Sequence, residues 1–210
     1  MIPKERLNLY LAQCPLVAII RGVTPGEADG IGRALFDAGI RIIEVPLNSP
    51  EPLESIRILS SALGNDALIG AGTVLTTEDV TKVQAAGGEL IVSPNTNTQV
   101  IAATAAAGMA SAPGYFTPSE AFAALEAGAD ALKLFPAEGA TPQVVKAQRA
   151  VLPKQVPLLV VGGVSPDNMQ PWLEVGANGF GLGSGLYKPG QTAAETAAKA
   201  AAYVHGVKRQ

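Results

Sequence analysis

The fold of this chain is decided by the stretch Asp130-Ala131-Leu132-Lys133-Leu134-Phe135-Pro136. Apolar residues crowd this stretch, which is typical of a buried strand in a parallel sheet. Side chains alternate along a strand, so Lys133 shares one face with Ala131 and Phe135. The other face carries Leu132 and Leu134. If these leucines pack against helices, Lys133 projects into the space that the sheet encloses.

A lysine buried in this way has two alternative roles. Burial disfavours the ammonium form, so the amine tends to lose its proton and becomes a nucleophile that can form a Schiff base with a carbonyl group. Alternatively, Lys133 is a structural cation paired with a carboxylate. We favour the catalytic role, because perturbed lysines cluster at functional sites and the other lysines all lie in predicted helices, loops or tails.

Short apolar runs recur along the chain, and most of them follow a glycine placed like a helix C-cap. These glycines are Gly39, Gly64, Gly87, Gly108, Gly128 and Gly176. A helical pattern follows each run, so the repeated unit is one strand and one helix. The predicted strands are Leu16–Ile20, Arg41–Pro46, Leu68–Ala71, Leu90–Ser93, Met109–Ala112, Ala131–Phe135, Leu158–Val161 and Gly179–Leu182.

Proline and hydroxyl residues predict where several helices begin. Thr24-Pro25, Ser49-Pro50, Thr117-Pro118 and Ser165-Pro166 each place an N-cap residue before a proline at the first helical position. Two terminal helices complete the pattern. One, over Pro3–Gln13, should cap the floor of the fold, and the other, over Ala193–Val204, should be the last outer helix.

Eight such units can close into a barrel or remain an open doubly wound sheet. Ile20-Arg21-Gly22-Val23 follows the first strand and is not a dinucleotide-binding fingerprint, which disfavours the open sheet. We therefore predict an α/β protein with a (β/α)8 TIM barrel, an extra N-terminal helix and one domain over residues 1–210.

The composition excludes several classes of function. The chain has 15 basic and 18 acidic residues, so it offers no basic surface for nucleic acid, and no segment is long and apolar enough for a membrane span. His205 and Cys14 are the only residues of their types, which argues against a zinc site and against an internal disulfide. A magnesium site built only from carboxylates is a remaining alternative, but no cluster of Asp and Glu residues indicates one, so we expect no metal or other cofactor. No signal peptide begins at Met1, and we therefore expect a cytoplasmic protein.

In a TIM barrel the carboxyl ends of the strands carry the function. Glu44 ends the second strand and points inward with Ile40 and Ile42, where it can exchange protons with the Lys133 chemistry or simply neutralise a cation. Arg21 ends the first strand and can bind a substrate anion or brace Glu44. Pro94 follows the fourth strand.

Two glycine motifs follow the last two strands, where barrels frequently bind phosphate through backbone N–H groups. They are Gly162-Gly163 and Gly183-Ser184. Thr73, after the third strand, offers a hydroxyl to a substrate, although a helix or turn cap explains it equally well. Phe135 can wall off a substrate or serve only in packing.

The sequence resembles the 2-keto-3-deoxy-6-phosphogluconate/galactonate aldolases along almost its entire length. The motifs that carry the resemblance are Gly70-Ala71-Gly72-Thr73-Val74-Leu75, Lys133-Leu134-Phe135-Pro136-Ala137 and Val161-Gly162-Gly163-Val164. The resemblance implies a class I aldolase, generally homotrimeric, with Lys133 as the Schiff-base lysine and Glu44 as the proton shuttle. It also implies that Thr73 contacts the pyruvate half of the substrate and that the glycine motifs and Ser184 bind its phosphate. Arg21 would bind substrate at an end that the resemblance leaves open.

Two positions depart from the gluconate enzymes, which usually have Arg-Thr shortly after the catalytic glutamate and threonine before the glycine pair. This chain has Leu47-Asn48-Ser49-Pro50 and Val161 instead. Both departures resemble the galactonate branch of the family. Valine cannot donate a hydrogen bond to one C4 epimer, so it should relax or reverse the preference between the epimers. We therefore expect the phosphorylated 2-keto-3-deoxy galactonate as substrate, with use of both epimers as an open alternative, and pyruvate as a product. The alternatives are the gluconate epimer, an unphosphorylated analogue, a phosphate-binding isomerase or epimerase, and a non-catalytic phosphosugar-binding barrel.

Overall fold

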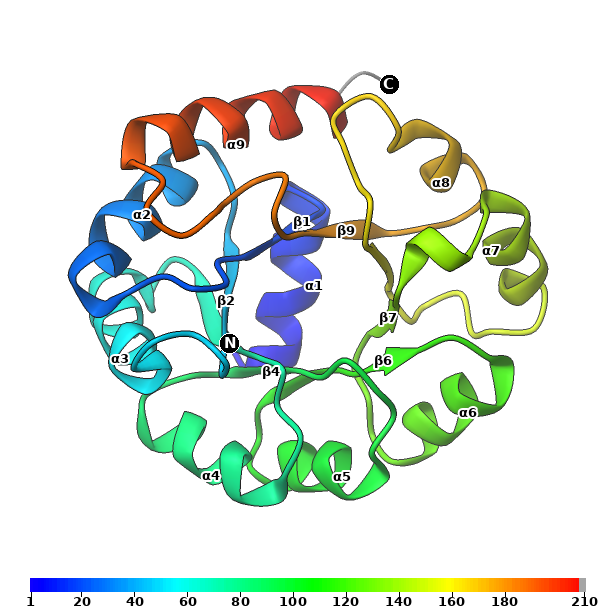
Figure 1. Ribbon diagram of the computed structural model, residues 1–210. Helices are drawn as coiled ribbons and strands as arrows, with labels where there is room; N and C mark the ends of the chain where they lie inside the picture. The colour runs from blue at the N-terminus through cyan, green and yellow to red at the C-terminus, as the bar shows by residue number, and fades with distance from the viewer. Residues whose placement is uncertain (208–210) are drawn as a thin grey trace.

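The structure is a computed structural model that describes residues 1–207 of the chain. Parallel strands form a central barrel, and helices surround it as an outer ring (Figure 1). The strands are β1 (Leu16–Ile19), β2 (Ile42–Pro46), β3 (Leu68–Gly72), β4 (Leu90–Val92), β5 (Ala110–Ala112), β6 (Gly114–Tyr115), β7 (Leu132–Leu134), β8 (Leu158–Val161) and β9 (Gly179–Leu182). The α-helices are α1 (Pro3–Gln13), α2 (Pro25–Asp37), α3 (Pro52–Leu63), α4 (Thr77–Ala85), α5 (Thr98–Ala106), α6 (Pro118–Glu126), α7 (Pro142–Arg149), α8 (Gln170–Glu174) and α9 (Ala193–Val207), and η1 (Ala137–Gly139) is a 3₁₀ helix.

The nine strand segments form an eight-stranded barrel, because β5 and β6 are one strand interrupted at Pro113. β5 pairs with β4, and β6 pairs with β7, so the two ends of the sheet meet at this proline. Proline has no backbone N–H to give to the ladder. Its carbonyl still accepts a hydrogen bond from the backbone N–H of Lys133 at 2.9 Å. The predicted (β/α)8 barrel is therefore confirmed, although the last residues of the predicted domain, 208–210, lie outside the described part.

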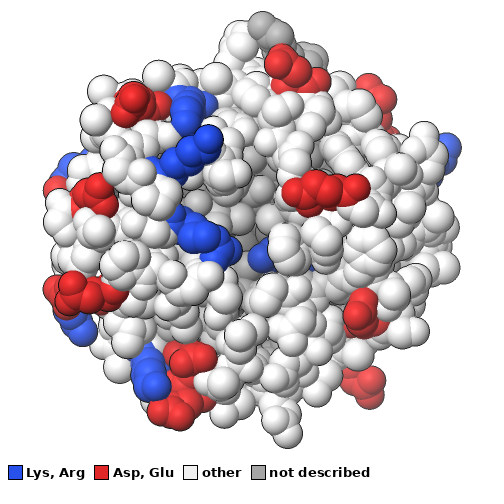
Figure 2. All heavy atoms as spheres, viewed as in Figure 1, with Lys and Arg blue, Asp and Glu red and all other residues white. Residues whose placement is uncertain are grey.

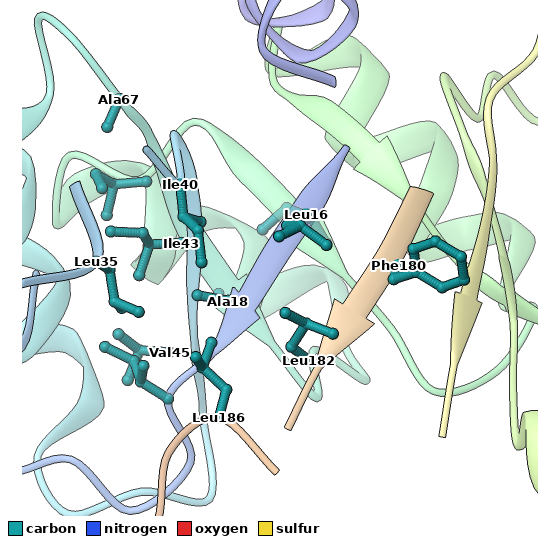
Figure 3. Close-up of a cluster of buried hydrophobic side chains, with 14 of the residues drawn as sticks. Leu16, Ala18, Leu35, Ile40, Ile43, Val45, Ala67, Phe180, Leu182 and Leu186 are labelled. Carbon is teal, nitrogen blue, oxygen red and sulfur yellow. The ribbon is translucent and has the colours of Figure 1, made fainter. Parts of the chain in front are cut away.

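Two apolar layers lie on the two faces of the sheet. The inner layer fills the barrel and includes Val17, Ile42 and Ala131, while the outer layer, between strands and helices, includes Leu132 and Leu134. Figure 3 shows part of the outer layer, which includes Leu16 of β1, Ile43 of β2 and Phe180 of β9. The alternation predicted for the Lys133 strand is thus confirmed. Among residues 1–207, no helix has the length and apolar character that a membrane span requires.

Two of the four predicted helix starts are confirmed and two are wrong. Thr24 and Thr117 are the N-caps of α2 and α6, each with a proline at the start of the helix and a capping box. α3 begins at Pro52 instead, because the Ser49 hydroxyl accepts a hydrogen bond from the N–H of Gly22 at 2.9 Å. Ser165 starts no helix either. The Asn168 side chain accepts its N–H in a turn, and α8 begins only at Gln170.

The predicted helix C-cap glycines are confirmed with one exception. Five of the six predicted C-cap glycines have positive φ, as the left-handed end of a helix requires. Gly64 ends α3 with a φ of −60°, in the right-handed region.

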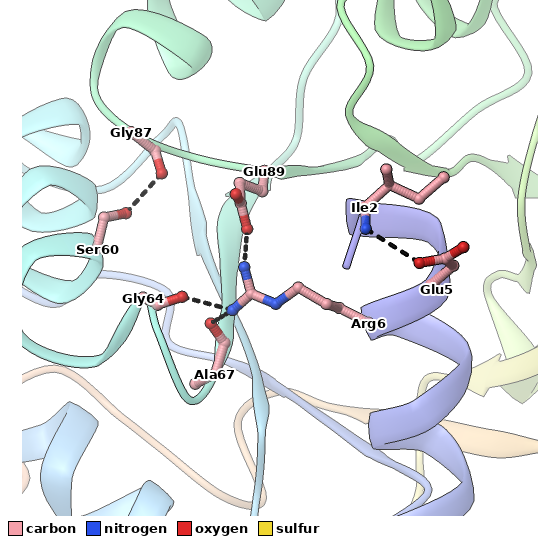
Figure 4. A network of polar contacts seen from close by, with 8 residues as sticks. All are labelled: Ile2, Glu5, Arg6, Ser60, Gly64, Ala67, Gly87 and Glu89. Carbon is pink, nitrogen blue, oxygen red and sulfur yellow. Dashed lines mark hydrogen bonds and ion pairs between the residues drawn. The ribbon is translucent and has the colours of Figure 1, made fainter.

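Helix α1 closes the floor of the barrel, as predicted. Its buried Leu7, Tyr10 and Leu11 belong to the inner apolar layer. On its other side Arg6 reaches out to the loops at the amino ends of β3 and β4 (Figure 4). The guanidinium donates to the carbonyl oxygens of Gly64 at 2.5 Å and Ala67 at 2.6 Å, and it forms an ion pair with Glu89.

We expect Arg6→Met to destabilise the fold by about 2 kcal/mol or more, because two carbonyls and a carboxylate lose a charged donor. Urea unfolding measures the change. Arg57→Met is the matched control, since Arg57 pairs with Glu54 on the exposed surface of one helix and should change stability little. Equal unfolding midpoints for the Arg6 and Arg57 variants would contradict this assignment.

Candidate active site

A cavity of about 580 Å³ opens at the carboxyl ends of the strands. Figure 2 shows this face, with a hollow near its centre and basic side chains at the hollow. The cavity wall contains every site residue that the sequence predicted. These are Arg21, Glu44, Thr73, Pro94, Lys133, Phe135, Val161, Gly162, Gly163, Gly183 and Ser184. The tertiary structure thus brings residues from seven of the eight barrel strands, or from the loops directly after them, to one place.

Lys133 lies at the bottom of this cavity, on the inner face of β7. Its side chain is enclosed, with the residue only 7% exposed, and its Nζ lies 4.8 Å from the centre of the Phe135 ring. Burial lowers the pKa of the Lys133 amine; the Glu44 carboxylate opposes this shift and the Arg21 guanidinium adds to it. The neutral, nucleophilic amine is therefore favoured at this position.

Glu44 projects from β2 into the same cavity and is 2% exposed. Burial raises the pKa of its carboxyl to about 7, against the attraction of Lys133 and Arg21 for the ionised form. Within residues 1–207 no group hydrogen-bonds its Oε2 atom. A carboxyl with a pKa near neutrality can both accept and donate a proton, as an acid/base catalyst must.

The position of Glu44 depends on Gly72 at the end of β3. A Cβ atom on Gly72 would overlap the Glu44 carboxylate, so a larger residue at 72 would push the carboxyl away. None of the ion pairs among the described residues joins Glu44 to Lys133. The two groups line one cavity and influence each other by charge.

Arg21 lies at the rim, where its guanidinium donates a hydrogen bond to Oδ1 of Asn48. Among residues 1–207 no hydrogen bond joins Arg21 to Glu44, so the structure gives no support to the alternative in which Arg21 only braces Glu44. A second bond, from the N–H of Gly22 to the Ser49 hydroxyl, ties the same two loops together. Asn48 was not selected from the sequence, because nothing local shows that the β2–α3 loop faces Arg21.

Thr73 has a φ of +56°, in the left-handed region that is unfavourable for a β-branched residue. Its alternative role as a helix cap is wrong, since Thr76 caps α4 by accepting from the N–H of Asp79. Residues held in such conformations concentrate at functional sites.

The two glycine loops form part of the cavity wall. Gly162 and Gly163 have φ values of +117° and +63°, which turn the backbone sharply after β8. Tyr203 of α9 holds this loop, because its hydroxyl donates to the carbonyl of Val164 at 2.9 Å, and it also packs closely against Gly185 in the next loop. Tyr203 and Glu138, which also lines this wall, had no signal in the sequence, because they come from elements far from the glycine motifs.

The pKa of Glu44 predicts a pH-dependent contribution to stability. Its pKa is about 7 in the folded chain and about 4.5 when unfolded, so the folded state holds a proton that the unfolded state releases between these values. The protonated Glu44 carboxyl therefore stabilises the folded state fully at pH values below its pKa in the unfolded chain. This stabilisation is lost as the pH rises through its pKa in the folded chain.

We therefore expect the free energy of unfolding of Glu44→Gln, compared with that of its parent, to rise as the pH increases from about 5 to about 8. The comparison should be made by urea unfolding in a Lys133→Met background, which removes the titration of the facing amine. A difference between parent and variant that stays constant with pH would show that the carboxyl is not held protonated by burial.

Comparisons with known proteins agree with this geometry. Residues 7–201 match the family described as KDPG and KHG aldolase. The chain is 49% identical over 195 residues to the 2-dehydro-3-deoxy-6-phosphogalactonate aldolase of Escherichia coli K12, covering 93% of this chain and 95% of that protein. It is 34% identical to a 2-dehydro-3-deoxy-phosphogluconate aldolase of Zymomonas mobilis, with 79% of this chain and 78% of that protein covered.

Solved structures show the same relationship. A structure described as native KDPGal superposes with a TM-score of 0.91 at 48% identity, covering 92% of this chain and 94% of that one. A protein cage designed by fusing symmetric oligomeric domains superposes with a TM-score of 0.92 at 47% identity, over 93% of this chain and 73% of that one. KDPG aldolase from Legionella pneumophila, which holds pyruvate as a covalent carbinolamine, has a TM-score of 0.79 at 28% identity over 95% of each chain. The chain belongs to the KDPG and KHG aldolase family.

Proposed function

We propose that this protein is a class I aldolase, a lyase that cleaves 2-dehydro-3-deoxy-6-phospho-D-galactonate to pyruvate and D-glyceraldehyde 3-phosphate. The observation that carries the proposal is the buried Lys133 amine with its lowered pKa, which shares a cavity with a Glu44 carboxyl whose pKa is raised to about 7. This pair supplies a nucleophile and a proton carrier in one place. The galactonate aldolase of E. coli, at 49% identity, supports the choice of substrate.

The reaction begins when the neutral Lys133 amine attacks the C2 ketone. Glu44 moves the protons that convert the carbinolamine to the iminium ion and a water molecule. The iminium then accepts the electron pair of the C3–C4 bond as that bond breaks, while Glu44 takes the proton of the C4 hydroxyl. Glyceraldehyde 3-phosphate leaves, and the remaining enamine is protonated at C3 and hydrolysed to pyruvate, which restores the free amine.

The remaining residues of the cavity orient the substrate. Arg21 influences the charge of both Lys133 and Glu44, so its guanidinium suits the carboxylate that is bonded to the reacting C2 carbon. The Thr73 hydroxyl contacts the pyruvate half, which Pro94 and Phe135 enclose. At the other end, Gly162, Gly163, Gly183 and Ser184 offer backbone donors to the phosphate. Binding at this distant end holds C4 in place relative to Lys133.

The test is trapping with borohydride. Pyruvate and borohydride together should label the protein irreversibly at Lys133, as mass spectrometry of the digested chain shows, and Lys133→Ala should remain unlabelled and inactive. Lys146→Ala is the control, because Lys146 is an exposed residue of α7 and should label and cleave like the parent. Glu44→Gln should label more slowly than the parent and should lower kcat by about 10²-fold or more, since glutamine carries no exchangeable acid proton.

The same experiment separates the other candidate functions. An isomerase, an epimerase or a non-catalytic binder would bind the phosphosugar, yet it would form no imine at Lys133. An unlabelled chain that still binds the phosphosugar would overturn the aldolase proposal.

Val161 is the residue that we expect to influence the choice between the C4 epimers. It lies in the inner layer at the end of β8, is 6% exposed and lines the cavity. Val161→Thr adds a hydroxyl in nearly the same volume. We expect kcat/KM to shift toward the gluconate epimer by about three- to tenfold, as one added hydrogen bond allows.

The measurement is the ratio of cleavage rates for the two epimers. Val161→Ala is the control, because it changes the shape of the side chain without adding a hydroxyl. Its ratio of cleavage rates should be closer to that of the parent than the ratio of Val161→Thr is. An unchanged ratio in the threonine variant would remove Val161 from the specificity determinants.

We further propose a homotrimer that acts in the cytoplasm and needs neither a metal nor an organic cofactor. Three large apolar side chains are exposed on or near the loops that follow β3 and β6, namely Leu75, Phe116 and Phe122. The similarity to domains used as symmetric oligomers in a designed cage supports self-association. Light scattering of the purified chain gives the number of subunits directly.

A further inference from the structure

Glu138 occupies the place where the proposed function puts the phosphate. It belongs to η1, which follows the Lys133 strand after Pro136, and it lines the cavity. A Cβ atom on Gly162 would overlap the Glu138 carboxylate, and one on Gly163 would lie 3.2 Å from its Cγ. The side chain of Glu138 therefore lies directly on the backbone turn that the two glycines form.

In the described part of the chain, no specific bond holds the Glu138 side chain against the glycine turn. Within residues 1–207 no hydrogen bond or ion pair involves the Glu138 carboxylate. The residue is exposed, and η1 is only three residues long. The basic residues of the cavity wall are Arg21, Lys133 and Lys188. An exposed side chain without a partner can leave the turn by rotation about its own bonds.

A phosphate and this carboxylate cannot share the glycine turn. The two anions would occupy overlapping space and would repel each other with little solvent between them. The glycine pair thus has two functions, because it permits the close approach of Glu138 as well as that of a ligand.

We propose that Glu138 is a specificity-determining residue that covers the phosphate turn in the ligand-free enzyme and must move away before a phosphate binds. The inference rests on the phosphate position given under the proposed function. When only a fraction of the molecules has an open turn, the apparent affinity for phosphate falls by that fraction. A substrate attached covalently to Lys133 presents its phosphate at high effective concentration and can still displace the side chain.

The consequence is discrimination against ligands that have a phosphate but no keto acid. Inorganic phosphate and simple phosphate monoesters bind only at the glycine turn, so they must displace Glu138 without binding to a second site in the cavity. Substrate does bind elsewhere in the cavity, at Lys133 and at the carboxylate site at Arg21. Glu138 therefore keeps the cavity free of abundant small phosphates without being part of the bond-breaking machinery.

Calorimetry with inorganic phosphate tests the proposal on the full chain. Glu138→Ala should bind phosphate about tenfold more tightly than the parent, because it removes both the charge and the side chain. Glu138→Gln keeps the size and loses the charge, so its affinity should lie between the two. Glu126→Gln, on the exposed end of α6, is the matched control and should bind like the parent.

Two readouts keep this inference separate from the aldolase chemistry. Labelling by pyruvate and borohydride needs no phosphate, so the Glu138 variants should label at the rate of the parent. KM for the phosphorylated substrate should fall in Glu138→Ala. Equal, weaker or undetectable phosphate binding in Glu138→Ala would overturn the inference, whereas absent labelling in the parent would overturn the aldolase proposal alone.

Discussion

The burial of one amine and one carboxyl in the same cavity is the constraint on which the rest of this structure depends. Both charged forms lose hydration inside the barrel, so Lys133 tends toward the neutral amine and Glu44 toward the protonated acid. Their mutual attraction opposes this tendency without removing it. A barrel suits the arrangement because its interior is filled by apolar side chains below the site, while the cavity above stays open to a ligand.

The scaffold maintains this burial from several directions. Helix α1 closes the floor through Leu7 and Leu11, and Gly72 leaves the space that the Glu44 carboxyl fills. The loops above are held by side chains, Arg21 bonding to Asn48 in the next loop and Tyr203 of α9 bonding to Val164. Rigid walls matter here, because an aldolase must hold C2 at the lysine while the far end of the substrate is bound elsewhere.

The glycine loops show how one sequence feature can have more than one physical reason. Gly162 and Gly163 need positive φ for the turn after β8, their backbone N–H groups suit the phosphate that we propose to bind there, and they leave room for Glu138. The first two reasons were readable from the motif and its position after the seventh barrel strand. The third was not, since Glu138 reaches the turn from the neighbouring strand's loop.

The sequence by itself determined the barrel, the inward face of Lys133 and those cavity residues that stand at strand ends, because strand alternation and the strand ends of a (β/α)8 fold follow from local patterns. It misplaced the starts of α3 and α8, because Ser49 bonds to the loop after β1 and Ser165 donates to Asn168 in a turn instead of capping a helix. The tertiary structure alone decided the partners of Arg21, the brace from Tyr203 and the cover from Glu138. Each of these contacts joins segments that are far apart in the sequence, and local sequence patterns do not show which segments meet.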